Sequence, residues 1–223
     1  MNYYNHQRNI LQTGHTATVS VITCTYNRAP YLDRCINSVL QQSIRNWELI
    51  IVDDGSSDNT FEVVDKYLTR YGNIRYIKQT NAGQGLARNA GIAIATGEYI
   101  TFLDSDDAYA PEHLQTRIDF MKSNPEIDLI HGGILFNDDI DVADYYVKGN
   151  LINLKECIIS GGLFGKSHLF YKLGGFKNQR YGEDTDLWER AKAKYKTFKI
   201  TEPETYIYTR AGLSASRENT DSI

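Results

Sequence analysis

Three aspartates follow a short apolar run in the middle of the chain, and their spacing is suited to metal chemistry. The segment reads Glu98-Tyr-Ile-Thr-Phe-Leu-Asp104-Ser-Asp106-Asp107. Carboxylates grouped at the end of a buried strand are costly unless a cation compensates their charge, and Mg²⁺ or Mn²⁺ prefers such oxygen ligands together with phosphates. An Asp-rich turn before the next helix would have the same residues, so this motif alone does not decide between a metal–nucleotide site and a turn.

The acidic pair Glu183-Asp184 is a second place where carboxylates are set up for chemistry. It precedes a stretch with apolar residues at helical spacing, among them Leu187 and Ala191. A carboxylate in the first turn of a helix is held in place, and the helix dipole keeps it ionised, as a general base requires. Capping of the helix by Asp184 or Asp186 is the alternative.

Alternating strands and helices must position these groups. Runs rich in apolar and β-branched residues predict strands at 19–25, 47–53, 74–78 and 98–104. Apolar residues recur at helical spacing within 32–40, 61–71 and 86–94. Strands separated by helix-length stretches predict βαβ units with right-handed crossovers, and hence an α/β fold with a doubly wound, mostly parallel sheet.

Polar clusters stand at the carboxyl ends of three of these strands. They are Thr25-Tyr26-Asn27, Asp53-Asp54-Gly55-Ser56 and Asp104-Ser105-Asp106. Ligands bind to such sheets outside the carboxyl ends of the strands. We therefore expect the three clusters to meet at one edge of the sheet and to form a binding site.

The composition narrows the class of protein. With 223 residues, 41% of them hydrophobic, the chain can bury one sizeable core. A net charge of −4 argues against a nucleic-acid partner. The three cysteines lack metal-ligand spacing, and residues 1–11 lack an apolar run of signal-peptide length. We expect a cytoplasmic protein with at most weak peripheral contact with a membrane. The lysine-rich segment 192–199 could make that contact, or its lysines could simply form a solvent-exposed helix face.

Several motifs, taken in order, resemble those of the family-two glycosyltransferases. They are Val19-Ser-Val-Ile-Thr-Cys-Thr-Tyr-Asn27, Ile50-Ile-Val-Asp-Asp-Gly-Ser-Ser-Asp58, Asn81-Ala-Gly-Gln-Gly-Leu-Ala-Arg-Asn-Ala-Gly91 and Phe102-Leu-Asp-Ser-Asp-Asp107. Lys172-Leu-Gly-Gly-Phe176 and Gly182-Glu-Asp-Thr-Asp-Leu-Trp188 resemble acceptor-side motifs of the same family. The resemblance covers roughly residues 17–216 and implies an inverting, metal-dependent enzyme with the GT-A fold.

The resemblance places the nucleoside of a donor on the first two polar clusters. Thr25 would hydrogen-bond the base and Tyr26 would pack against it, with Asn27 beside them. Asp54 would accept a hydrogen bond from the ring N–H of the base, which favours a UDP-sugar although guanine and thymine carry the same donor. A simple strand-to-helix turn at Asn27 and helix capping by Asp54 are the alternatives.

The glycine-rich segment Gly83-Gln84-Gly85-Leu86-Ala87-Arg88 does not complete a dinucleotide fingerprint, because an arginine takes the place of the third glycine. In a glycosyltransferase, Gly83 would let the loop pass close to the donor sugar and its diphosphate. Arg88 is suited either to pair with the diphosphate or to pair with the carboxylates of the Asp-x-Asp segment, and a purely structural pair with Asp104 is equally open.

The remaining roles also follow from the resemblance. Asp106 is the implied ligand of Mn²⁺ or Mg²⁺, Asp104 would contact the ribose or the metal, and Ser105 would lie beside the donor. Asp184 is the implied general base, with Glu183 as its nearest rival.

The C-terminal segment departs from the family pattern Tyr-Arg-x-His. Here Thr209 and Ala211 occupy the Arg and His positions, which puts a histidine metal ligand in doubt. Arg210 is expected to take over the contact with the diphosphate, within a closing loop at 209–217.

We therefore expect a nucleotide-sugar-binding half at 17–107 and an acceptor-binding half at 108–216, with tails at 1–16 and 217–223. The partners would be a nucleoside diphosphate sugar and a glycan or lipid-linked acceptor. A sugar-1-phosphate nucleotidyltransferase is the alternative enzyme, but it would need a glycine-rich basic loop after the first strand, which Thr25-Tyr-Asn-Arg-Ala-Pro30 is not. A non-catalytic relative that binds nucleotide or glycan is the other alternative.

Overall fold

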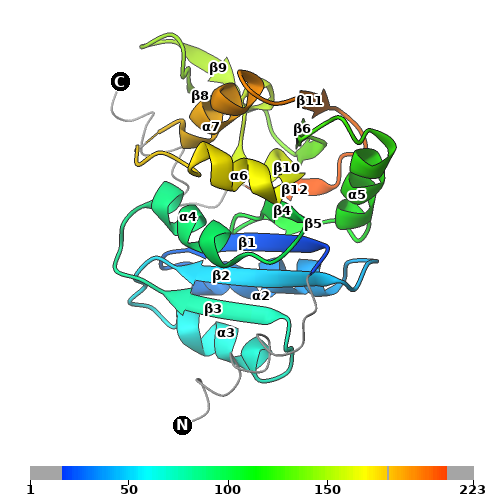
Figure 1. Cartoon of the computed structure of the whole chain (residues 1–223). Helices are drawn as coiled ribbons and strands as arrows, with labels where there is room; N and C mark the ends of the chain where they lie inside the picture. The colour runs from blue at the N-terminus through cyan, green and yellow to red at the C-terminus, as the bar shows by residue number, and fades with distance from the viewer. Residues whose placement is uncertain (1–16, 180, 210–223) are drawn as a thin grey trace.

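A seven-stranded sheet runs through the centre of the molecule (Figure 1). The computed structural model describes residues 17–179 and 181–209. The strand order is β11-β6-β10-β4-β1-β2-β3. In that order the strands are Thr197–Ile200, Leu129–Gly132, Leu163–Lys166, Tyr99–Phe102, Val19–Thr25, Trp47–Asp53 and Ile74–Lys78.

The first part of the chain builds four parallel strands. β1 pairs with β2 on one side and with β4 on the other, and β3 pairs with β2. The strands predicted at 19–25, 47–53 and 74–78 are confirmed residue for residue, whereas β4 is shorter than the predicted run because residues 103–107 turn away into the acidic loop. The carboxyl ends of β4, β1 and β2 therefore lie next to one another, as expected.

Helices cover both faces of the sheet, as its alternating side chains require. The helices are α2 (Ala29–Leu40), α3 (Thr60–Leu68), α4 (Gln84–Ile94), α5 (His113–Ser123), α6 (Ser167–Leu173) and α7 (Glu183–Lys192). One core packs Val21 and Leu49 of the sheet against α2, α3 and α5. The other core packs Ile22 and Ile50 against α4, α6 and α7. Because neighbours along a strand enter opposite cores, the doubly wound α/β architecture is confirmed.

β10 is the one antiparallel element of the seven-stranded sheet. It lies between β4 and β6 and runs opposite to both, while β11 pairs with β6 in parallel. The sheet is thus mostly parallel, as predicted. β6, β10 and β11, from the second expected half of the chain, join β1 to β4 in this sheet, so both halves share one sheet.

Two smaller sheets lie beside the main one. β5 (Ala108–Tyr109), β12 (Tyr206–Tyr208) and β7 (Ile134–Phe136) form the first. β8 (Asp141–Ala143) and β9 (Leu151–Asn153) form an antiparallel hairpin near α7 (Figure 1). The segment 137–150 contains β8 and the connection to β9. Within the described part of the chain, no helix is long and apolar enough to span a bilayer.

We expect the close approach of α4 to β1 to make Gly91 sensitive to substitution. A Cβ at this position would lie 2.5 Å from Cγ2 of Ile22, which is 1% exposed. Gly91→Ala should therefore lower the free energy of unfolding by about 1–3 kcal/mol, measured by urea denaturation. Gly72→Ala is the matched control, because nothing lies within 4 Å of a Cβ there. Equal stability of the two variants would contradict the tight packing of α4.

Candidate functional site

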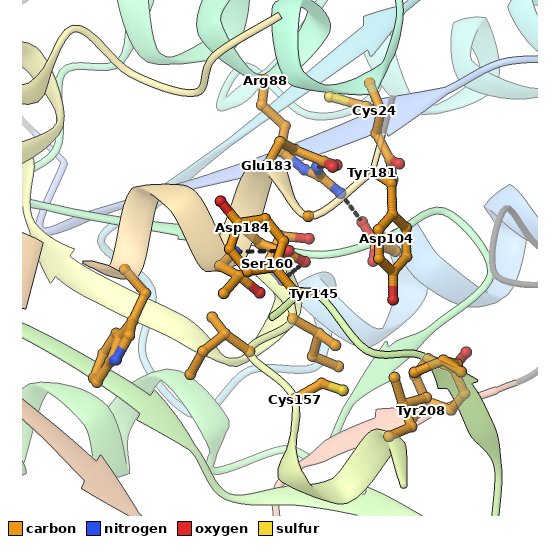
Figure 2. Close-up of a pocket in the computed structure, with 18 of the residues that line it drawn as sticks. Cys24, Arg88, Asp104, Tyr145, Cys157, Ser160, Tyr181, Glu183, Asp184 and Tyr208 are labelled. Atoms are coloured by element: carbon orange, nitrogen blue, oxygen red, sulfur yellow. Dashed lines mark hydrogen bonds and ion pairs between the residues drawn. The ribbon is translucent and has the colours of Figure 1, made fainter. Parts of the chain in front are cut away.

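A cavity of about 660 Å³ opens at the carboxyl edge of β4, β1 and β2. It brings together most of the residues that the sequence singled out. Those lining it are Thr25, Tyr26, Asp54, Gly83, Arg88, Asp104, Ser105, Asp106, Glu183 and Asp184. Figure 2 shows part of this cavity, with Arg88, Asp104, Glu183 and Asp184 converging from different elements. The donor-side and acceptor-side motifs thus face one common space.

The end of β1 presents two unlike groups to the cavity. Tyr26 is half exposed, at 50%. The Oγ1 of Thr25 is buried, and among the described residues it has no hydrogen-bond partner. A buried hydroxyl without a partner is unusual in a folded protein, because leaving it unsatisfied is costly. A hydroxyl of this kind in a cavity wall is ready to bond a bound molecule.

Asn27 differs from the expectation, because it is not among the residues that line the cavity. Its Oδ1 accepts hydrogen bonds from the backbone N–H groups of Ser57 at 2.8 Å and Asp58 at 3.3 Å, and its own N–H donates to Ser56 Oγ at 2.9 Å. It also adopts a positive φ of 51°. The side chain therefore ties the loop after β1 to the loop after β2.

Asp54 fixes the loop that carries Gly83. Its Oδ1 accepts from Gln79 Nε2 at 2.7 Å and from the Ala82 N–H at 2.9 Å, and its Oδ2 accepts from the Gly83 N–H at 2.9 Å. Asp58, not Asp54, bonds the first N–H groups of α3 and α2: it accepts from Thr60 and from Ala29, each at 3.1 Å. An ionised carboxylate offers about four acceptor positions, so Asp54 retains room for one more donor.

Arg88 joins the two acidic motifs across the cavity (Figure 2). This guanidinium is 2% exposed, donates to Asp104 Oδ1 at 3.1 Å and donates to Glu183 Oε1 at 2.8 Å. Although burial opposes its charge, Asp104 and Glu183 raise the pKa of Arg88. Of the roles left open by the sequence, the structure shows the pair with Asp104 and adds the pair with Glu183.

Asp106 lies between Arg28, beside its carboxylate, and Arg34, near its backbone carbonyl. Its Oδ2 accepts from Arg28 Nη1 at the long distance of 3.3 Å. Burial and the neighbouring Asp104 carboxylate raise the pKa of Asp106 above its usual range, while Arg28 opposes the shift. Two carboxylates that repel each other in a cavity wall are a setting that a divalent cation would stabilise.

These residues fit a metal bound jointly with a diphosphate. Mg²⁺ is usually held by one or two carboxylates, with phosphate oxygens and water completing its shell. Asp104 and Asp106 would provide the two carboxylates. In the described ranges, no group of three or more His, Cys, Asp or Glu side chains is arranged to hold a metal by itself. The donor set therefore suits an ion that arrives with a nucleotide rather than one bound permanently by protein ligands.

Asp107 has a structural role that the sequence did not reveal. It is 1% exposed, and its carboxylate accepts hydrogen bonds from the Tyr206 hydroxyl and, at 2.6 Å, from the Thr209 N–H. The Tyr206 oxygen also accepts from the Asp104 N–H at 3.3 Å. Asp107 therefore fastens the acidic loop to the start of the C-terminal segment. Arg210 and the rest of the predicted closing loop lie outside the described residues.

Asp184 lies in the first turn of α7 without a cationic partner of its own among the described residues. Its Oδ2 accepts from the Ser160 N–H at 3.2 Å, and its Oδ1 accepts from the adjacent Thr185 N–H at 2.8 Å. Burial, followed by the neighbouring Glu183 charge, raises the pKa of Asp184 to about 7. Asp186 is engaged elsewhere, by Lys177 and Arg190. The contact from Ser160 joins residues 24 apart and has no signal in the sequence.

Residues 20–162 match a protein-family model described as "Glycosyl transferase family 2". The match includes the ends of β1, β2 and β4 but stops before Glu183 and Asp184. The roles of these two carboxylates therefore depend on the geometry and on the sequence motif.

Glycosyltransferases from several bacteria are similar in sequence. An uncharacterized glycosyltransferase of Nostoc is 44% identical over 114 residues, which is 51% of this chain and 35% of the Nostoc protein. One from Rickettsia felis is 41% identical over 187 residues, covering 79% of this chain and 30% of the relative. Glycosyltransferase GlyG of Streptococcus pneumoniae is 35% identical over 63% of this chain and 47% of its own length. The chain spans roughly a third to a half of the length of these relatives.

Two solved structures share the fold. S. aureus TarS 1-349 in complex with UDP-GlcNAc superposes with a TM-score of 0.73 at 22% identity, covering 90% of this chain and 60% of TarS 1-349. Mannosyltransferase PcManGT from Pyrobaculum calidifontis, in complex with GDP-Man and Mn2+, superposes with a TM-score of 0.68 at 18% identity. The match covers 96% of this chain and 65% of PcManGT. The predicted GT-A fold is confirmed by these neighbours.

We expect the Arg88 bridge to be important for stability. Arg88→Ala would leave the Asp104 and Glu183 carboxylates facing each other without their shared cation, and breaking a buried ion pair in this way costs roughly 3–5 kcal/mol. Urea denaturation would measure the loss. Lys155→Ala is the control, because it removes an ion pair to Asp139 on the exposed surface and should leave stability nearly unchanged. Similar unfolding midpoints for both variants would contradict a structural role for the bridge.

Proposed function

Because the chain belongs to glycosyl transferase family 2, we propose that it transfers a sugar from a nucleoside diphosphate sugar to a hydroxyl of an acceptor, with inversion at the anomeric carbon. One observation carries the proposal: a single cavity is lined by the ends of β1, β2 and β4 and by the carboxylates that open α7. Inverting transfer needs a donor site and a base that face each other across the reacting carbon.

The donor side supports a nucleotide. The unpartnered hydroxyl of Thr25 and the exposed ring of Tyr26 flank the place where a base would lie, and Asp54 retains acceptor capacity for a ring N–H. The two structural neighbours are in complex with UDP-GlcNAc and with GDP-Man. We favour a UDP-sugar. The space beside Gly83 leaves room for its diphosphate, because a Cβ there would meet nothing within 4 Å.

Asp104 and Asp106 would hold Mn²⁺ or Mg²⁺ together with the donor. Such an ion neutralises the leaving diphosphate, a Lewis-acid effect of several kcal/mol. Arg28 already lies beside Asp106 and would stay within reach of the phosphates. Ser105, buried in the turn between the two aspartates, shapes this part of the wall.

The two carboxylates of α7 divide their work. The Glu183 carboxylate forms an ion pair with Arg88, whereas the Asp184 carboxylate accepts hydrogen bonds from backbone N–H groups. Since Asp184 has a pKa raised to about 7, it can both exist as a carboxylate and accept a proton near neutral pH. We therefore assign Asp184 as the base that removes the proton of the attacking hydroxyl, with the acceptor a glycan or a lipid-linked sugar.

The direct test is a donor-turnover assay with Mn²⁺ across UDP-, GDP- and dTDP-sugars. We expect slow hydrolysis of one nucleotide class and faster turnover when acceptors are added. A complete lack of turnover and of nucleotide binding with all three classes would contradict the proposed activity.

Metal should strengthen donor binding. Calorimetry should show that UDP binds more tightly with Mn²⁺ or Mg²⁺ present, and that Asp106→Ala removes most of this gain, because one of two carboxylate ligands is lost. Asp65→Ala, at an exposed position of α3 outside the cavity, is the control. Binding that is equally tight with a chelator would contradict the metal assignment.

Asp184→Asn should leave UDP binding nearly intact while transfer falls by about 10²-fold or more, because only proton removal is lost. Steady-state kinetics and calorimetry on the same preparation would separate the two effects. If transfer survives in this variant and disappears in Glu183→Gln with unchanged folding, Glu183 is the base instead.

The raised pKa of Asp184 predicts a pH profile. Because the carboxylate is the active form, kcat/KM should fall about tenfold per pH unit below about pH 7 and level off above it. The residual activity of Asp184→Asn should lack this limb. A wild-type profile that stays flat down to pH 5 would show that no group with a raised pKa acts as the base.

A further inference from the structure

Aromatic side chains of the β8–β9 hairpin form the end of the cavity nearest to α7. Tyr145 and Tyr146, in the connection between the two strands, both line the cavity and are 41% and 66% exposed. Their rings pack edge to face, with centroids 5.2 Å apart. Among the described residues the Tyr145 hydroxyl has no hydrogen-bond partner. The proposed reaction leaves this exposed aromatic surface without a role.

The Tyr145 ring lies directly against the start of α7. A Cβ at Gly182 would lie 2.2 Å from Cδ2 of Tyr145 and 2.6 Å from Cε2, so only a glycine allows the ring to come this close. Gly182 also has a φ of 72°, which favours glycine. Glu183 and Asp184 are the next two residues, so the ring lies against the start of the helix that carries the carboxylate assigned as the base. Figure 2 labels Tyr145 and Asp184 in this cavity.

Contacts on either side hold the hairpin in this position. Asp144 accepts from the N–H groups of Tyr146 at 2.8 Å and Val147 at 3.3 Å, which fixes the turn. The Tyr146 hydroxyl donates to Glu189 Oε1 of α7 at 2.9 Å, and the Tyr181 hydroxyl donates to the Ala143 carbonyl. The hairpin therefore holds Tyr145 in place before a ligand binds, so binding to its ring would cost little conformational entropy.

The surroundings of the ring combine aromatic and charged groups. Glu156, Glu189, Lys192 and Lys199 line the same cavity as the tyrosines, and Glu189 bonds Tyr146 directly. An alkyl chain here would remove water from these groups without giving them hydrogen bonds, which is unfavourable. A hexopyranose offers an apolar C–H face for the ring and hydroxyls at its edge for the charged groups, and sites that combine aromatic walls with a few polar groups suit such a molecule.

We propose that Tyr145 is the platform on which a hexopyranose ring of the acceptor stacks, which makes the acceptor a glycan and places one of its hydroxyls at Asp184. This inference rests on the proposed function, because that function identifies Asp184 as the base. It assigns Tyr145 as a positioning and specificity residue.

The test uses the full chain and small probes without nucleotide. Methyl glycosides of glucose, galactose and mannose, with 1-hexanol as the apolar comparator, are titrated by saturation-transfer NMR. At least one glycoside should bind, with transfer strongest at the C–H groups of one ring face, and hexanol should not. Tyr145→Ala should weaken binding by about tenfold, whereas Tyr145→Phe should retain most of it. Tyr71→Ala, 37% exposed and outside the cavity, is the control.

Calorimetry with UDP and Mn²⁺ separates this inference from the proposed function. Tyr145→Ala should bind UDP as the wild type does and keep its thermal stability. Weaker UDP binding in Tyr145→Ala would overturn the inference, since the ring would then belong to the donor side. Binding of hexanol alone, binding of no glycoside, or glycoside binding unaffected by Tyr145→Ala would overturn it as well. Glycoside binding that depends on Tyr145 in a chain that binds no nucleotide would overturn the proposed function and leave the platform standing.

Discussion

The site depends on one buried cation. Arg88, on α4, donates to Asp104 at the end of β4 and to Glu183 at the start of α7, two residues that lie 79 positions apart in the sequence. A buried guanidinium is stable only when it is paired, so both carboxylates must be present for α4 to pack where it does. The same contacts hold the acidic loop and the first turn of α7 together in the wall of one cavity. Packing of the core and spacing of the site therefore have a common cause.

The bridge also makes two adjacent carboxylates different. Glu183 forms an ion pair with Arg88, whereas the Asp184 carboxylate accepts only from backbone N–H groups and lies beside Glu183, which keeps its negative charge in that pair. Burial and that neighbouring charge raise the pKa of Asp184 to about 7, the range in which a base works best at neutral pH. The environment of each group, rather than its residue type, separates the structural acid from the proposed base.

The runs of apolar and β-branched residues in the sequence predicted β1, β2 and β3 correctly. The position of the site followed from them, because parallel strands bring their carboxyl ends to one edge of the sheet. It did not predict contacts that join distant residues. Tyr206 reaches Asp107 across 99 positions, and Ser160 reaches Asp184 across 24. Asn27 was expected in the site, but loop packing with Ser57 and Asp58 occupies its side chain. The hairpin around Tyr145 was missed because its strands are only three residues long.

β10 is synthesised long after β4, the strand whose second edge it covers. β4 is buried along its whole length, yet its second neighbour in the sheet is supplied only by residues 163–166. During synthesis, β1 to β4 can pair as soon as residue 102 has emerged, but one edge of β4 then stays open while about sixty further residues are made. An open apolar edge is a template for pairing with other chains. The nascent chain is therefore most exposed to misassembly in this interval, which ends when β10 inserts between β4 and β6.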